Sequence, residues 1–171
     1  MTSIDARESL FKTGRPKIRP MALDDVRWLW ASHRMQEKPE MGQDEFYAHI
    51  SSELEKFAKI YIAEDTNAQF KDGVGPVGIF VANFDGWNLE PHVEFFPWAT
   101  NRNKVKAVVG FLVFQRFQKD IGCIRIHASE KFRSFFSRMK KYIPIRVGGK
   151  IAGGRPEGAD YIFYVRGKRQ H

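Results

Sequence analysis

The chain has 171 residues and a formal net charge of +8 at pH 7, and hydrophobic residues make up 43% of it. This length and composition are typical of a folded enzyme or binding module with one core, and they exclude a chain that needs disulfides or metals to compensate for a small core. The positive charge predicts an anionic partner, either a nucleotide cofactor, a nucleic acid or an acidic protein surface.

A single cysteine, Cys123, excludes an intramolecular disulfide and lies in an apolar run typical of a buried, inert thiol. The longest uninterrupted apolar stretch, residues 107–114, is too short to cross a bilayer, and the first residues lack the apolar centre of a signal peptide. We therefore expect a soluble, cytoplasmic protein without a membrane partner.

The chain begins with a predicted arm and an edge strand. Residues 1–16 are polar without a clear period, so we expect a loose arm ahead of a single domain that spans residues 17–171. Residues 17–21 are expected to form a short edge strand, because Pro20 lacks the N–H that an inner strand would donate.

Two helices are predicted next. Asp24 and Asp25 suit the first turn of a helix whose apolar face continues toward His33. A connection over residues 35–43 follows, and Asp44 is placed to cap a second helix. The buried stripe of that second helix is formed by Phe46, Ile50, Leu54 and Phe57.

The middle of the chain predicts a hairpin. Residues 61–63 are a short strand candidate, and residues 64–75 are predicted to be a polar loop. Residues 77–83 have a strong strand pattern, and the pair at 85–86, Asp-Gly, predicts a tight turn into a further strand over residues 90–98. We expect these last two strands to pair antiparallel.

After that strand, which Pro97 ends, a basic turn leads into a helix that is apolar nearly all round and must lie inside the protein. Arg102, Lys104 and Lys106 crowd its start, where backbone N–H groups and the helix dipole already favour anions. Cations there oppose the dipole unless an anion binds. The pattern predicts a phosphate or pyrophosphate at the helix start, and a solvated basic turn is the alternative that the residues leave open.

The C-terminal part predicts three more strands and a helix. Residues 121–127 are expected to run parallel to the strand before the central helix, because a crossover helix joins the two. Ser129 is placed to cap an amphipathic basic helix. Residues 142–147 and 161–165 add two strands, which a glycine-rich loop over residues 148–158 separates.

This order of elements resembles the GNAT family of N-acetyltransferases across almost the whole chain. A more specific likeness is a hexapeptide similar to the family's Q/R-x-x-G-x-G/A signature. The hexapeptide is Arg102-Asn103-Lys104-Val105-Lys106-Ala107. Val105 stands where the signature has a glycine. The resemblance implies the α/β GNAT (acyl-CoA N-acyltransferase) fold, in which a mixed twisted sheet has flanking helices and the strands on either side of the central helix diverge at the cofactor.

In the family this turn holds the pyrophosphate of coenzyme A, so the resemblance implies acetyl-CoA or another acyl-CoA as cosubstrate, and no metal. The backbone amides of residues 103–107 and the side chains of Arg102 and Lys104 would hold the pyrophosphate, and Lys106 would add a third cation. Phe95 and Phe96 would lie beside the acyl end of the cofactor, and the N–H of Phe95 would donate to the acetyl carbonyl.

The implied reaction is direct attack of a primary amine on the acetyl carbon, which needs a base for the ammonium proton and a site for the oxyanion. Glu94 matches the strand position where such enzymes often carry a glutamate, and His92 on the same face is the second candidate. The alternative for both is an ordinary surface strand residue. The family's tyrosine acid has no match in residues 134–137, and Tyr142 is the nearest tyrosine.

The acceptor is not identified by any motif. The resemblance implies that residues 33–43 and 148–158 surround an amine that is either a small molecule or part of a protein. The sequence alone does not indicate the oligomeric state.

A second hypothesis comes from the stretch VEFFPWATNRNK, which looks like GNAT-like proteins of tailed bacteriophages. Under this hypothesis the protein is a catalytically inert head-assembly or internal virion protein, in the host cytoplasm or the virion. It would contact virion components or nucleic acid through its basic surface. A direct nucleic-acid binder ranks last, because the basic residues are dispersed and the aromatic residues have core spacing.

Overall fold

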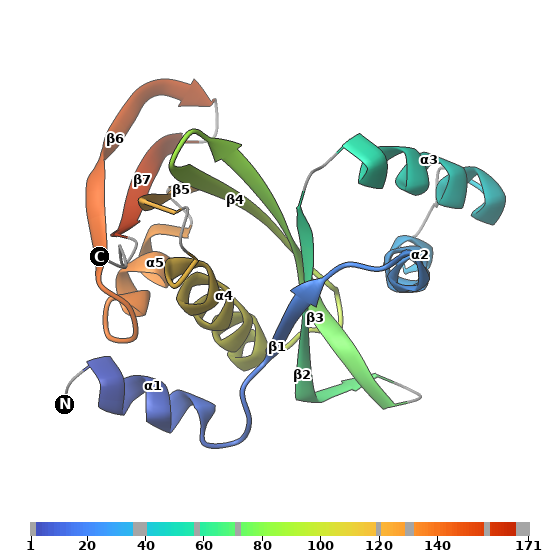
Figure 1. The fold of residues 1–171 in the computed structure, drawn as a ribbon, viewed down its shortest axis with the longest axis horizontal. Helices are drawn as coiled ribbons and strands as arrows, with labels where there is room; N and C mark the ends of the chain where they lie inside the picture. The colour runs from blue at the N-terminus through green and yellow to red at the C-terminus, as the bar shows by residue number, and fades with distance from the viewer. Residues whose placement is uncertain are drawn as a thin grey trace.

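The structure is a computed structural model that describes residues 3–35, 41–56, 59–70, 73–118, 121–128, 132–155 and 158–166 (Figure 1). The elements are α1 (Ser3–Phe11), β1 (Lys17–Pro20), the 3-10 helix η1 (Leu23–Asp25), α2 (Val26–Arg34), α3 (Gln43–Lys56), β2 (Ile60–Phe70), β3 (Gly73–Asp85), β4 (Asn88–Phe95), α4 (Asn101–Arg116), β5 (Cys123–Ala128), α5 (Arg133–Met139), β6 (Ile145–Arg155) and β7 (Gly158–Arg166).

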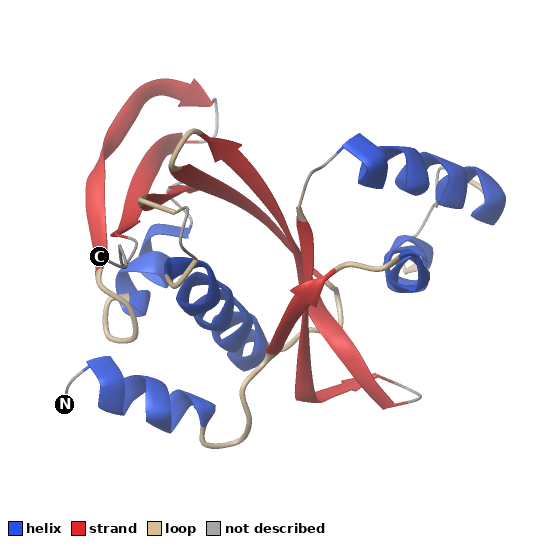
Figure 2. Cartoon of the chain, viewed as in Figure 1, coloured by secondary structure: helices blue, strands red, loops and turns tan. Residues whose placement is uncertain are grey.

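Seven strands form one mixed sheet in the order β1-β2-β3-β4-β5-β7-β6. β4 and β5 run parallel, and the other neighbouring pairs are antiparallel. Figure 2 shows α1, α4 and α5 on one side of the curved sheet, with α2 and α3 on the other. The predicted mixed sheet with flanking helices is confirmed. No helix in the described part of the chain is both long and apolar enough to cross a membrane.

The core is built around α4. Ala107 and Leu112 are buried, and the ring of Phe111 stacks on that of Phe80 in β3 with the centroids 4.3 Å apart. Burying a side chain of the size of Leu or Phe stabilises a fold by about 1.5–3 kcal/mol, so these contacts hold the helix against the sheet. The prediction of an interior helix is confirmed.

β4 brings alternating side chains to the two faces of the sheet. It enters through the predicted hairpin, where Gly86 has a φ of 57° that favours glycine, and it pairs antiparallel with β3. Val93 and Phe95 pack against the core around α4. His92 and Glu94 therefore lie on the opposite face, which is the face toward α2 and α3.

β4 and β5 pair only where both strands begin. Asn88 lies opposite Cys123 and Leu89 lies opposite Ile124, and the described residues show no pairing beyond these. The other edge of β5 pairs with β7. The C-terminal half of β4, which includes Phe95, faces an opening in the sheet. The prediction of parallel strands that diverge is confirmed.

Residues 3–11 of the predicted arm form α1, which is docked on the core. Ala6 is buried, and Leu10 and Phe11 pack against the core around α4. These tertiary contacts stabilise a helix whose sequence has little apolar periodicity, which is why the sequence did not predict it.

The chain after α1 fits against a glycine of α4. A Cβ added to Gly110 would lie 2.7 Å from Cγ of Pro16, which is too close for a side chain. Gly110 therefore allows Pro16, which is itself buried, to contact the helix directly. This contact fixes the position of α1 along α4.

Two predicted loops are strands instead. β2 and β3 extend through most of residues 64–75, and β6 and β7 extend through most of residues 148–158. In each hairpin the antiparallel pairing continues past a shift in register, so ladder hydrogen bonds outweigh the polar or glycine-rich composition. Ser129 lies outside the described residues, and the predicted basic helix, α5, begins at Arg133.

Arg19 ties the edge strand β1 to η1 and β2. Its guanidinium lies 2.7 Å from the carboxylate of Asp25 and 2.6 Å from that of Glu64. Burial alone would raise the pKa of Asp25, but hydrogen bonds from Arg19 and from the N–H of Ala22 outweigh it and hold that pKa below its usual value. The cluster fixes the entry into α2.

Candidate functional site

The backbone of Phe95 faces the opening between β4 and β5. The N–H of Phe96 donates to the carbonyl of Val77 in β3 at 3.0 Å. Because successive N–H groups of a strand point to opposite edges, the N–H of Phe95 points away from β3 and toward the side of β5. The predicted contact with an acetyl carbonyl needs this orientation.

Phe96, the other residue predicted beside the acyl end of the cofactor, is buried at the end of β4. Its N–H is bonded to β3, and its side chain is 3% exposed. Its ring stacks on Trp98 with the centroids 4.7 Å apart, and the indole N–H of Trp98 donates to the carbonyl of Pro76. Phe96 therefore supports the end of β4 from inside.

The first turn of α4 begins earlier than the likeness to the signature predicts. Thr100 caps the helix, and its Oγ1 accepts a hydrogen bond from the N–H of Asn103 at 3.3 Å. The N–H of Lys104 donates to the carbonyl of Thr100 at 2.9 Å. The amides of residues 105–107 lie further inside the helix, where each is paired one turn back. An anion would meet the amides of Thr100 to Arg102 rather than the predicted set.

Two of the predicted cations stay near the surface at this turn. Arg102 is exposed, and its Nη2 lies 3.5 Å from Oγ1 of Thr13. The ammonium of Lys104 lies 5.6 Å from the centre of the Phe95 ring, so it is close to the end of β4. Both side chains are placed to add charge to an anion site between β4 and α4.

Lys106 is turned into the protein. It is 1% exposed, and its ammonium lies 3.3 Å from the carboxylate of Asp65 in β2, which is fully buried. Lys106 shares the buried face of α4 with Asn103, which lies three residues before it at helical spacing. Its ammonium is paired with Asp65 between the helix and the sheet. The side chain therefore points away from the surface where it was expected to contact a phosphate.

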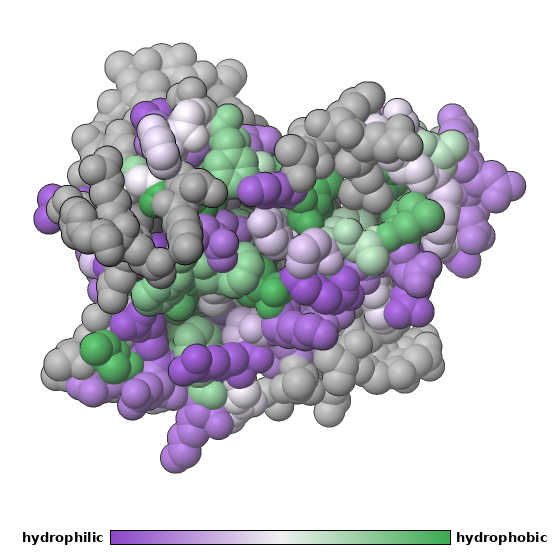
Figure 3. All heavy atoms as spheres, viewed as in Figure 1, coloured by the Kyte–Doolittle hydropathy of each residue, from purple (hydrophilic) through white to green (hydrophobic). Residues whose placement is uncertain are grey.

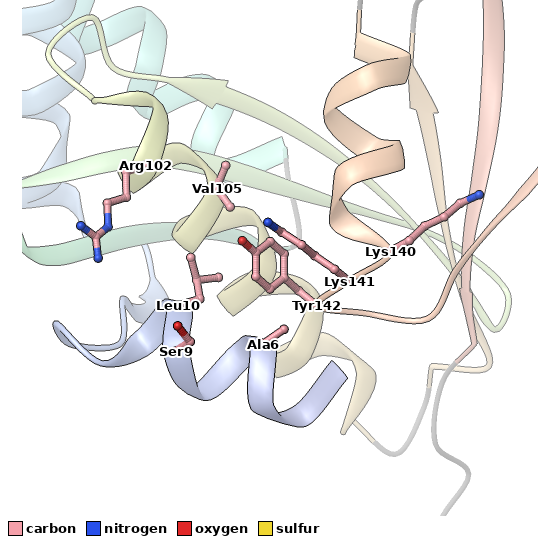
Figure 4. Close-up of a pocket in the computed structure, with 8 residues that line it drawn as sticks. All are labelled: Ala6, Ser9, Leu10, Arg102, Val105, Lys140, Lys141 and Tyr142. Carbon is pink, nitrogen blue, oxygen red and sulfur yellow. The ribbon is translucent and has the colours of Figure 1, made fainter. Parts of the chain in front are cut away.

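A cavity of about 600 Å³, which we call the basic cavity, lies beside the first turns of α4. Figure 4 shows the ammonium of Lys141 and the hydroxyl of Tyr142 turned toward α4, across from Arg102 and Val105. The cavity is lined by Ala6, Ser9, Leu10, Arg102, Val105, Lys140, Lys141 and Tyr142. Three of these residues are cationic and none is acidic, so the basic cavity favours an anionic ligand.

Sequence reasoning missed two walls of the basic cavity. The sequence predicted an arm in place of α1, and it predicted an amphipathic basic helix, without a ligand site, near the lysines that follow α5. A pair of adjacent lysines at a helix end carries no signal of a site by itself. Tyr142, the tyrosine nearest to the position of the family's acid, lines the basic cavity and lies apart from Glu94.

A second cavity, of about 190 Å³, lies on the opposite face of the sheet, and we call it the Glu94 cavity. It lies between β3 and β4 on one side and α2 and α3 on the other. Its lining residues are Leu29, Ser32, His33, Phe46, Ile50, Ile79, Glu94 and Phe96. In the space-filling view, apolar residues are visible between the sheet and the pair of helices (Figure 3).

Two polar residues, Ser32 and His33, line this cavity together with Glu94, and His33 is the one with an aromatic ring. Its imidazole stacks on Phe46 at 4.8 Å and on Trp30 at 5.5 Å between ring centroids. Its Nε2 is buried and has no hydrogen-bond partner in the described part of the chain. The sequence placed His33 on the apolar face of the first helix, four residues after Leu29, but its approach to Glu94 depends on the packing of the helix on the sheet.

His92 and Glu90 share the exposed face of β4 with Glu94, but neither lines the Glu94 cavity. The carboxylate of Glu90 lies 3.4 Å from Arg125 and 3.7 Å from His127 in β5. The described residues show no ion pair for Glu94. Of the acidic residues on this strand, Glu94 is therefore the one whose charge is open to a ligand.

No family model matches this chain, and no curated protein matches its sequence. Solved structures match it along nearly their whole length. The spermidine N-acetyltransferase from Vibrio cholerae in complex with CoA and spermine has a TM-score of 0.64 at 12% identity, over 90% of this chain and 96% of that one. A GNAT-family acetyltransferase from Bacillus anthracis has a TM-score of 0.64 at 15% identity, over 91% and 97%. The chain has the GNAT fold, as the sequence predicted.

Proposed function

We propose that this protein is an acetyl-CoA-dependent N-acetyltransferase that moves an acetyl group to a primary amine by direct attack. The observation that carries the proposal is the separation of β4 from β5, which leaves the N–H of Phe95 facing an opening beside the basic start of α4. The shared fold supports it, because one neighbour was solved with CoA. Another acyl-CoA would fit the same argument.

The cofactor would use the positive charge at the start of α4. Its pyrophosphate would meet the amides of Thr100 to Arg102, with charge-assisted bonds from the side chains of Arg102 and Lys104. Lys141 of the basic cavity would contribute to binding the phosphate group of CoA that is not part of the pyrophosphate. The pantetheine arm would then follow the opening between the strands, with the thioester carbonyl near the N–H of Phe95.

Glu94 would be the general base. It would take a proton from the ammonium of the acceptor, and the free amine would attack the acetyl carbon while the N–H of Phe95 stabilises the oxyanion. A C–N bond forms, the C–S bond breaks, and the CoA thiolate takes up a proton. His33 lines the same cavity as Glu94 and is the alternative base, in place of the predicted His92.

The inert virion protein remains the second candidate, and two observations favour it. Val105 contributes a side chain to the wall of the basic cavity, where the family's signature has a glycine. The amides of Asn103 and Lys104 are already hydrogen-bonded to Thr100. The Val105 side chain takes up space that a diphosphate would need, and the two bonded amides are not free to donate to it. In that case the basic surface would contact virion components or nucleic acid.

Calorimetry with acetyl-CoA on the full chain tests the proposal. We expect salt-sensitive binding, because the cations at the site are partly exposed and are screened by salt. Arg102→Glu should abolish binding, whereas Arg34→Glu should not, because Arg34 is exposed at the far end of α2. At a ligand concentration about a hundred times Kd, binding should stabilise the fold by about 2.7 kcal/mol. No heat and no thermal shift at millimolar acetyl-CoA would favour the inert protein.

A further inference from the structure

The Glu94 cavity has the dimensions of a small ligand site. Its volume is about 190 Å³, and five of its eight lining residues are apolar. An apolar cavity of about 150 Å³ accommodates benzene. A ligand with a body of about one ring therefore fills this cavity, and a long flexible chain does not fit within it.

The polar groups of the cavity select a hydrogen-bond donor. The carboxylate of Glu94 accepts hydrogen bonds, and it is exposed where the cavity meets the face of β4. Nε2 of His33 is buried, and stacking on Phe46 and Trp30 keeps the ring from turning toward water. A ligand that donates to both groups removes the cost of the unpaired nitrogen. An ammonium group, with three donors, meets this requirement.

The charge of the cavity favours a ligand with a single positive charge. Glu94 is the one carboxylate among the described lining residues. A polyamine brings additional ammonium groups, and inside this cavity they would lie against a lining whose remaining polar side chain, Ser32, carries no negative charge, which is unfavourable.

From these contacts we infer that the acceptor is a compact primary monoamine with an apolar body, of the size of benzylamine or cyclohexylmethylamine. This inference rests on the proposed function and names the substrate class of the same site. The apolar body lies among Leu29, Phe46 and Ile50, and the amine lies between Glu94 and His33.

The test uses the full chain saturated with CoA for binding, and with acetyl-CoA for turnover. Binding of benzylamine, cyclohexylmethylamine and spermidine is measured by ligand-observed NMR, and turnover by thiol release. We expect kcat/KM for either monoamine to exceed that for spermidine at least tenfold. His33→Phe keeps the stacking but removes the nitrogen, and it should weaken monoamine binding about tenfold. His49→Phe, at an exposed position of α3, is the matched control and should change nothing.

A second variant blocks the cavity by size, and CoA binding shows whether that variant is still folded. Ile50→Trp fills the cavity with a larger ring and should abolish monoamine binding, while CoA binding stays within twofold of the wild type. A preference for spermidine, or monoamine binding that neither variant alters, overturns the inference.

The inference and the proposed function fail in different ways. If CoA binds and neither monoamine binds at 10 mM, a concentration on the order of ten times a weak millimolar Kd, the substrate class is wrong and the proposed function stands. If monoamines bind and His33→Phe removes that binding, the ligand site is supported even when no thiol is released, and the transferase proposal is then the part that fails.

Discussion

The buried pair of Lys106 and Asp65 gives the sharpest test of the structure, because the sequence assigned Lys106 to a different role. Both side chains are at most 1% exposed, and their charges lie 3.3 Å apart. Replacing Lys106 with Met keeps the apolar stem but leaves the carboxylate of Asp65 buried without that cation. Removing one partner of a buried pair costs about 3–5 kcal/mol.

The loss is measured by urea unfolding and by thermal melting. For a domain of this size, each 1 kcal/mol shifts Tm by about 2–4 °C, so the expected decrease is about 6–20 °C. The double variant Lys106→Met, Asp65→Leu removes both charges and should recover most of the stability, because an apolar pair of similar volume is often neutral or better.

Two results would refute this reasoning. One is a loss below about 1 kcal/mol in Lys106→Met, which is the range of an exposed pair. The other is a double variant no more stable than the single one. The same variants separate the two roles of Lys106, since a folded double variant should bind acetyl-CoA with unchanged affinity if the charge acts only inside the protein.

Further predictions concern catalysis, charge and pH. Glu94→Gln should lower turnover about a hundredfold or more and leave CoA binding unchanged, and full turnover in a kinetic assay would remove Glu94 from the mechanism. Tyr142→Phe, measured by calorimetry, should weaken acetyl-CoA binding by less than tenfold, because it removes one hydroxyl from the basic cavity and no charge. The pKa of Asp25 is lowered in the fold, so its contribution is complete above the usual carboxyl range and is lost as pH falls through the lowered value. The difference in urea midpoint between the wild type and Asp25→Asn should therefore shrink between pH 7 and pH 2.5, and a constant difference would contradict the role of Arg19.

Much of the central unit could be predicted because its signals are local. The Asp-Gly turn at 85–86 and the alternation up to Pro97 indicate a hairpin, and the dense apolar pattern after residue 104 indicates a buried helix. A crossover helix between two strands then requires that they run parallel. These are the parts that the structure confirms.

The remaining features depend on partners that are distant in sequence. Lys106 and Arg102 look alike in a basic turn, and only the helix start at Asn101 shows which of them faces the sheet. The burial of Lys106 depends on Asp65, which lies in a segment that the sequence predicted to be a loop. His33 reaches the Glu94 cavity only because α2 packs against the far face of β4.

The contact of Pro16 with Gly110 has a consequence for how ligands are sensed. α1 supplies one wall of the basic cavity through Ala6, Ser9 and Leu10, so any anion bound there is also a ligand of docked α1. Thermodynamic linkage then acts in both directions. An anion in the cavity stabilises the docked α1 and slows amide exchange in it, and a change that detaches α1 lowers the affinity for the anion by the same coupling factor. Bulk added at Gly110 would act on the cavity from a distance, because it displaces Pro16. The first helix of the chain thereby reports whether the cavity is occupied.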